Sequence, residues 1–239
     1  MIIAGHQPNY LPYCGFFNKI AHCDLFAIVD TVQFVKRGPF GWQHRNRIRT
    51  KDGWMWLTVP VLTKGRYYQK INEVEINNDI NWRRKHWMSI YLNYKKAPHF
   101  NKYSDFFEDL YKRNWDKLID LNMEVISYLL KALKIDKKIF RCSELSIESG
   151  KSQLLVEMCD KFGSGTYLSG IHGRDYLDFD LIKRNNLKVL FQNFNQPVYE
   201  QLYNDFIPDL SVIDLLFNKG DESTDLILNR KEEAAQYVE

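Results

Sequence analysis

The chain has few cysteines, little net charge and no long hydrophobic run. Its 239 residues include four cysteines, no two of them at Cys-x-x-Cys spacing, and the His residues are scattered rather than paired. This pattern argues against a zinc or other metal site and predicts reduced thiols in a cytoplasmic protein. No apolar run approaches the roughly 20 residues of a membrane span. An amphipathic membrane anchor is not expected either.

Charge is nearly balanced overall but uneven along the chain. The 33 basic and 30 acidic residues leave a net charge of +3, too small to predict nucleic acid as the main ligand. Residues 36–51, however, contain six Lys or Arg and no acid. Aromatic residues are abundant at 15%. Most will be core, although Tyr and Trp also suit partly wet pockets.

The first twenty residues are the most informative part of the sequence. An apolar run ends at Gly5, a polar loop with two prolines follows, and Gly15 opens a segment with apolar residues at helical spacing. This order predicts a strand, a rigid loop and a helix, and ligands of α/β sheets bind just beyond the carboxyl ends of strands. The polar loop residues are His6, Gln7, Asn9 and Tyr10. With a strand starting at residue 2, we also expect no targeting peptide.

The rest of the pattern is that of an α/β protein with a mostly parallel central sheet, flanking helices and a helical insertion. The continuous apolar run 25–29 is typical of a buried parallel strand. Further strands are expected at 45–49, 54–61, 74–76, 140–143, 166–169 and 188–191. Helices are expected from 79 or 81 to 94 and at 104–111, 115–133, 149 or 152–162, 179–185 and 212–217. We predict one domain over 1–220, with the insertion near 79–135 and a charged tail over 221–239, helical or frayed.

Three residues are candidates for acid–base chemistry. His6 follows the first strand and has an ordinary pKa near neutral pH, so it suits proton transfer or phosphate contact. Asp30 ends the second strand and would share an edge with His6 if the two strands are parallel, although Asp-Thr is also ordinary turn chemistry. His172, in the loop after strand 166–169, is a second acid–base candidate or simply a loop histidine.

Other residues are candidates for binding a ligand. On a strand, Arg45, Arg47 and Arg49 would lie on one face, which suits a diphosphate because Arg forms forked bonds to phosphate oxygens; a solvated basic face is the alternative. Residues 38–41 could form a flap. The remaining candidates are Gln33, Asn46, Ser169, Gly170 and Gln192, besides Gln7, Asn9 and Tyr10. We expect His86 to serve in packing or in a helix-surface contact rather than in catalysis, and Ser211 to cap the last helix in a near capping box with Asp214.

Four stretches together resemble the WbqC-like protein family: His6–Pro12, Asp30–Phe34, Arg45–Arg47 and Leu210–Leu216. Members often occur in gene clusters for bacterial surface polysaccharide, the O-antigen of lipopolysaccharide. The resemblance therefore implies a transferase or ligase that modifies a nucleotide-linked amino sugar, glycyl transfer to the sugar amine being one such step.

Two other functions remain open. Residues 2–34 are faintly similar to nucleotidylyltransferase-like enzymes such as pantothenate synthetase, which would bring in ATP and Mg²⁺, but the His-x-Gly-His and Lys-Met-Ser-Lys-Ser signatures are absent. A non-catalytic binding or scaffold protein of the same pathway fits the lack of any complete catalytic motif. A nucleic-acid binder is a weaker third reading. The oligomeric state, a homo-oligomer included, is open too.

Overall fold

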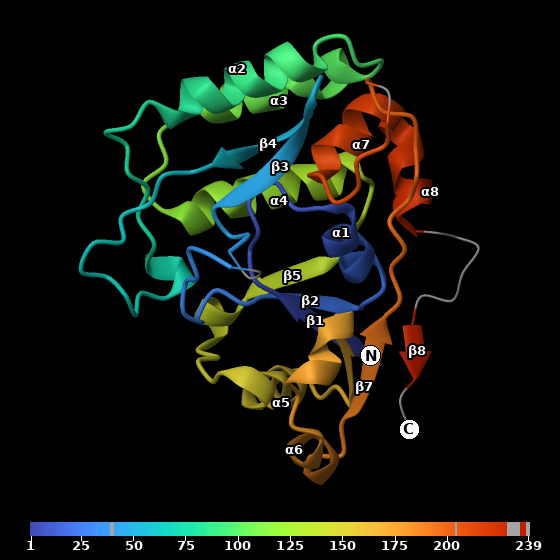
Figure 1. Ribbon diagram of the computed structural model, residues 1–239. Helices are drawn as coiled ribbons and strands as arrows, with labels where there is room; N and C mark the ends of the chain where they lie inside the picture. Colours follow the sequence, from blue (N-terminus) through green and yellow to red (C-terminus); the bar gives the residue numbers. More distant parts are fainter. Residues whose placement is uncertain (39–40, 204, 229–234, 238–239) are drawn as a thin grey trace.

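A computed structural model describes residues 1–38, 41–203 and 205–228, and the backbone of 235–237. Two β-structures organise it: a six-stranded sheet in the order β5-β2-β1-β6-β7-β8 and a separate hairpin, β3-β4 (Figure 1). The predicted mostly parallel α/β sheet is confirmed, since β1, β2, β5, β6 and β7 run parallel and β8 joins the edge antiparallel. The strands are β1 (Ile2–His6), β2 (Leu25–Ile28), β5 (Lys138–Arg141), β6 (Thr166–Ser169), β7 (Lys188–Gln192) and β8 (Ala235–Tyr237).

The strand order reverses at β1. From β1 the chain passes through α1 (Cys14–Ala21) to β2 on one side, whereas β6 and β7 lie on the other. Such a reversal opens a crevice at the carboxyl ends of the central strands, which is where α/β proteins bind ligands. His6 ends β1 at this point and Ser169 ends β6.

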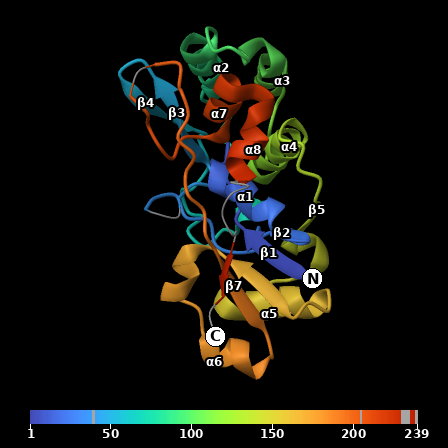
Figure 2. The same cartoon turned by 90° about the vertical axis from the view of Figure 1, so that its right-hand side faces the viewer.

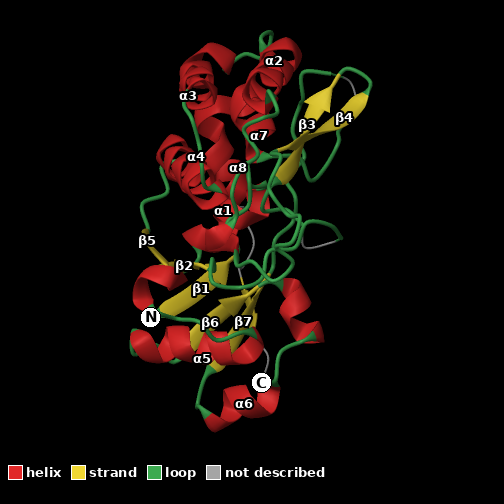
Figure 3. Cartoon of the chain, turned by 90° about the vertical axis from the view of Figure 1, so that its left-hand side faces the viewer, coloured by secondary structure: helices red, strands yellow, loops and turns green. Residues whose placement is uncertain are grey.

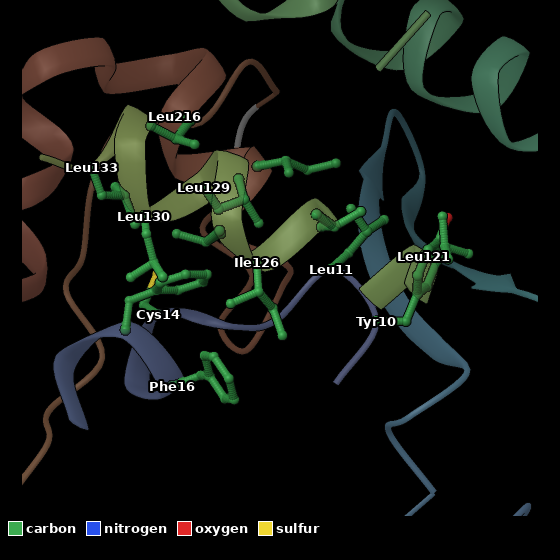
Figure 4. Close-up of a cluster of buried hydrophobic side chains, with 14 of the residues drawn as sticks. Tyr10, Leu11, Cys14, Phe16, Leu121, Ile126, Leu129, Leu130, Leu133 and Leu216 are labelled. Atoms are coloured by element: carbon green, nitrogen blue, oxygen red, sulfur yellow. The ribbon is translucent and has the colours of Figure 1, made fainter. Parts of the chain in front are cut away.

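Alternate residues of the buried strands face two different helical layers. Ile3 and Ala27 pack with α5 (Lys151–Lys161), whereas Ala4 and Phe26 pack with α1 and α4 (Leu118–Ala132). The apolar face of α4 meets the loop after β1, the start of α1 and α7 (Val212–Lys219) (Figure 4). Its buried side chains include Leu121, Ile126, Leu129 and Leu130. These apolar side chains recur at helical spacing on one face of α4, so that face acts in packing.

The helical insertion is confirmed, and two of its three helices form one end of the molecule. Its helices are α2 (Trp82–Tyr94), α3 (Phe100–Lys112) and α4. Figures 2 and 3 show α2 and α3 at this end, beside the hairpin of β3 (Arg45–Thr50) and β4 (Gly53–Thr58), and α6 (Phe179–Arg184) at the opposite end. Across the described part of the chain, no helix has both the length and the apolar character that crossing a bilayer requires.

Some predicted boundaries were wrong for local reasons. Residues 74–76 form single bridges to Lys117 and Val61 rather than a strand, because one isolated bridge on each side makes no continuous ladder. β5 begins two residues earlier than expected and stops at Arg141, where a 3-10 turn (Cys142–Leu145) takes over. β4 ends before Pro60, which cannot donate to a ladder.

The first part of the expected tail is packed. A 3-10 turn (Gly220–Glu222) leads into α8 (Ser223–Leu228), whose Ile227 is fully buried. Asn18 of α1 donates to the Ile227 carbonyl, and Thr224 donates to the Leu133 carbonyl. Residues 229–234 and 238–239 lie outside the described part of the chain.

Candidate functional site

His6 lies half-buried at the end of β1, with its ring set edge-on to Phe16. Its Nδ1 lies 2.9 Å from the Gln7 carbonyl oxygen. Because a carbonyl can only accept, the neutral ring carries its proton on Nδ1 and keeps Nε2 as an acceptor. Burial, together with the nearby Lys19 charge, lowers the pKa of His6 to about 4. The imidazole is therefore neutral at physiological pH and can accept a proton.

Lys19 is a residue of this site that the sequence analysis missed. It lies on the buried side of α1, 4% exposed, and its Nζ donates to the Gly5 carbonyl at 3.0 Å. Burial lowers the pKa of this ammonium to about 8. The available signal was a single cation on a helix face that otherwise carries Phe16, Phe17 and Ile20.

The loop after β1 is tied to the segment that leads into β3. The Gln43 side-chain amide donates to Gln7 Oε1, and the Tyr10 N–H donates to the Trp42 carbonyl at 3.1 Å. Asn122 of α4, fully buried, donates to the carbonyls of both Pro8 and Gln43, at 2.9 and 2.8 Å. Asn122, a polar residue within an apolar stripe, was also missed.

The remaining candidates in and beside the loop are buried inside the protein. Asn9 is 4% exposed, and Asn46 donates to the Leu11 carbonyl at 2.6 Å. The Tyr10 hydroxyl is hydrogen-bonded to His86 Nδ1, at 2.8 Å, and to the Tyr111 hydroxyl. His86 thus packs inside the protein, as predicted.

The hairpin carries interleaved arginine and tryptophan side chains. The Arg45 guanidinium lies 4.5 Å from the ring centre of Trp56, and that of Arg47 lies 5.1 Å from Trp54 and 5.9 Å from Trp42. The three indoles also contact one another, with Trp42–Trp56 and Trp54–Trp56 ring centres 5.4 and 5.5 Å apart. Stacking on a ring attracts a cation and orients the plane of a guanidinium. We call this set of five residues the Arg–Trp face.

Arg49 is the third arginine of β3, but its side chain has a structural role. It is 2% exposed and donates to the carbonyls of Thr50, Gly53 and Asp205. Among the described residues Arg45 donates one hydrogen bond, from Nε to the Gly41 carbonyl at 3.2 Å. Arg47 donates to the Asp209 carbonyl at 2.9 Å.

Three of the sequence stretches singled out above meet here. The Ser211 N–H donates to the Arg47 carbonyl, and the Val212 N–H donates to the Pro12 carbonyl, both at 2.9 Å. Phe34, from the fourth stretch, packs edge-on against His44 just before β3. Residues spread over most of the chain thus build one region, above the sheet edge at which His6 lies.

Asp214 has a different role from the one predicted. Ser211 does cap α7, but the Asp214 carboxylate is fully buried and accepts from Tyr94, Tyr199 and Gln201 rather than closing a capping box. Those donors lie on elements that the sequence does not place beside α7. Burial raises the pKa of Asp214, against the effect of the three hydrogen bonds.

Asp30 lies on the same edge as His6, because β1 and β2 are parallel. Its carboxylate is fully buried and accepts from Arg141 Nε at 2.9 Å, from the Ser143 N–H at 3.0 Å and from the Ser143 hydroxyl at 2.6 Å. These contacts join the end of β2 to β5.

The candidates on the β6 and β7 side lie apart from one another. Ser169 is buried at the end of β6, and Gly170 precedes the 3-10 turn Ile171–Asp175. His172, in that turn, has a side chain 87% exposed, 3.6 Å from Asp175. Gln192 faces α1 and donates to Gly15 and Asn18.

Gln33 lies at a surface groove of about 660 Å³. Its side chain donates to the carbonyl of Tyr67, which lines the groove with Tyr68, Arg66 and Lys117. The predicted flap at 38–41 includes residues 39 and 40, which lie outside the described residues. Within the described residues, no three His, Cys, Asp or Glu side chains are grouped to hold a metal ion.

The fold and this region define a doubly wound α/β protein with a helical insertion. Its hairpin of arginine and tryptophan side chains lies by the carboxyl ends of the central strands, where the strand order reverses. Residues 7–226 match the WbqC-like protein family, and the chain belongs to that family. It is also 34% identical, over 223 residues, to the uncharacterized protein Rv1507c of Mycobacterium tuberculosis, covering 92% of this chain and 95% of that one. No solved structure matches it significantly.

Proposed function

We propose that the chain is a transferase that acts on a nucleotide-linked amino sugar in surface polysaccharide assembly, forming an amide at the sugar amine. The observation that carries the proposal is the Arg–Trp face beside the loop that follows His6. Stacked guanidiniums suit a diphosphate, and indole rings suit a base or a sugar. Membership of the WbqC-like family supports the pathway context.

In this mechanism His6 is the general base. An uncharged amine attacks the acyl carbon of an activated donor, and its N–H becomes acidic as the C–N bond forms. The bond between the acyl carbon and the donor's leaving group then breaks, and the leaving group departs with the electron pair of that bond. The Nε2 of the neutral imidazole accepts that proton, because Nδ1–H is engaged by the Gln7 carbonyl. Burial, together with the nearby Lys19 charge, keeps the ring neutral by lowering its pKa. Asp30 and Asn122 hold the strand end and the loop in position.

Calorimetric titration with UDP- and dTDP-linked amino sugars tests the proposal. We expect saturable binding, weakened at least about tenfold by Arg45→Ala because a charge-assisted phosphate contact is lost. His6→Ala should retain binding and lose turnover with an activated acyl donor. Arg184→Ala is the matched control, since its Nε also donates to the carbonyl four residues earlier and it lies on α6, at the opposite end.

Other results of this experiment would support a different function. Binding of ATP with Mg²⁺ alone would favour the adenylating alternative. Tight binding of a nucleotide sugar with no turnover under any donor would favour a binding protein. Binding that Arg45→Ala and Arg184→Ala leave equally unchanged would remove the Arg–Trp face from the site.

A further inference from the structure

The outward face of α2 combines cations with exposed apolar side chains. Trp82, His86, Ile90 and Tyr94 line the buried side of the helix. The opposite side carries Arg84, Met88, Tyr91 and Lys95, at helical spacing, with Lys85 and Leu92 beside them. Leu92 is 57% exposed, and Met88 and Tyr91 are each 38% exposed. These six residues form one stripe along the helix, the α2 stripe.

The charge of this segment has one sign. Residues 80–98 contain five Lys or Arg and no Asp or Glu. None of these five cations forms an ion pair within the described residues; the Lys95 ammonium lies 5.3 Å over the Tyr91 ring, and Arg83 donates to the Arg113 carbonyl. On the neighbouring α3, Glu108 and Asp109 are paired with Lys112.

The stripe is also placed where a flat surface can reach it. Figures 1 and 3 show α2 at the extreme end of the molecule, away from the sheet and α6. At 1.5 Å per residue, its 13 residues span about 20 Å. Because the side of α2 that carries Trp82, His86, Ile90 and Tyr94 is buried, the stripe faces away from the protein at this end.

We propose that the α2 stripe docks on the surface of a bilayer that contains anionic phospholipid. Helices that lie in the interface carry Lys and Arg for the lipid phosphates and apolar side chains that enter the headgroup boundary. A nucleic acid would also meet the cations, but it would leave Met88 and Leu92 without an apolar partner. The inference goes beyond the proposed function and does not rest on it.

Vesicle co-sedimentation of the full chain tests the inference. We expect binding to vesicles of phosphatidylcholine and phosphatidylglycerol at 7:3, weak binding to pure phosphatidylcholine, and a decline as salt rises. Lys85→Glu with Lys95→Glu should lower the partition coefficient at least about tenfold, since each basic residue near such a surface contributes about 1 kcal/mol. Leu92→Ser should lower it at every salt concentration.

The control pair is Lys161→Glu with Lys183→Glu, which makes the same charge change on exposed positions of α5 and α6. Circular dichroism melts of all variants separate lost binding from lost folding. Failure to bind anionic vesicles at low salt, or equal loss with the control pair, would overturn the inference. So would binding of duplex DNA that the α2 variants abolish while vesicles bind none of the proteins.

Discussion

At the scale of single residues, several ionisable side chains lie buried near the site and the core. Lys19 and Asp214 are each at most 4% exposed, and His6, although only half-buried, is largely desolvated. Burying a charge is costly unless it is paired or the group becomes neutral. Lys19 donates to the carbonyl of Gly5, the residue before His6, and its charge lowers the pKa of the imidazole through space.

Replacing Lys19 should therefore change the titration of His6. Lys19→Met keeps most of the side-chain volume and removes the charge that lowers the pKa of His6, so we expect that pKa to rise from about 4. Titration of the imidazole Cε1–H signals by NMR measures it. Lys131→Met, on the exposed side of α4, is the control. An unchanged His6 pKa would mean that burial alone keeps the ring neutral.

At the scale of elements, the site depends on contacts between segments that are far apart in the chain. Asn122 reaches Pro8 across 114 residues, and Asp214 reaches Tyr94 across 120. The helical insertion thus supports the loop after β1 as well as covering the sheet. Substitutions in α4 should therefore disturb the loop after β1 at the site.

Asn122→Ala tests this link. The variant leaves the carbonyls of Pro8 and Gln43 buried without their donor, at roughly 1–3 kcal/mol each, so we expect a loss of about 2–6 kcal/mol in the free energy of unfolding. Urea denaturation at pH 7 measures it, with Asn101→Ala, exposed on α3, as the control. A loss no larger than that of the control would show that another group or water replaces the amide.

At the scale of the whole molecule, acid should destabilise the fold. Burial is the main cause that lowers the pKa of His6, His44 and His86 to about 4 each. Between pH 6.5 and 4 the unfolded chain therefore binds more protons than the folded one, so stability is full above pH 6.5 and is lost as pH falls. Three protons correspond to a slope of at most about 4 kcal/mol per pH unit.

Asp214 acts in the opposite sense, because its raised pKa makes the folded state hold its proton longer as pH rises. Urea unfolding at pH 7.5, 6.5, 5.5 and 4.5 checks the balance. His86→Gln should reduce the slope by about one proton, whereas His172→Gln, at an exposed side chain, should leave it unchanged. A flat profile from pH 7 to 5 would contradict the prediction.

Local pattern alone was enough to predict the α/β class, the parallel sheet, the helical insertion and several exact elements, such as β6 at Thr166–Ser169. Period and capping are properties of neighbouring residues, so they can be read without the fold. The same holds for Ser211 as the cap of α7 and for the edge that His6 and Asp30 share, which follows once two buried strands are parallel.

Only the tertiary structure decided the strand order, the partners of Asp214 and Asp30, and the roles of Lys19 and Asn122. Each depends on which long-range surface a side chain meets, and many pairings satisfy the same periodicity. The Arg–Trp face depends partly on the sequence pattern and partly on the tertiary structure. The alternation of Arg45 and Arg47 is visible in the sequence, whereas the register that sets Arg47 opposite Trp56 exists only once β3 and β4 have paired.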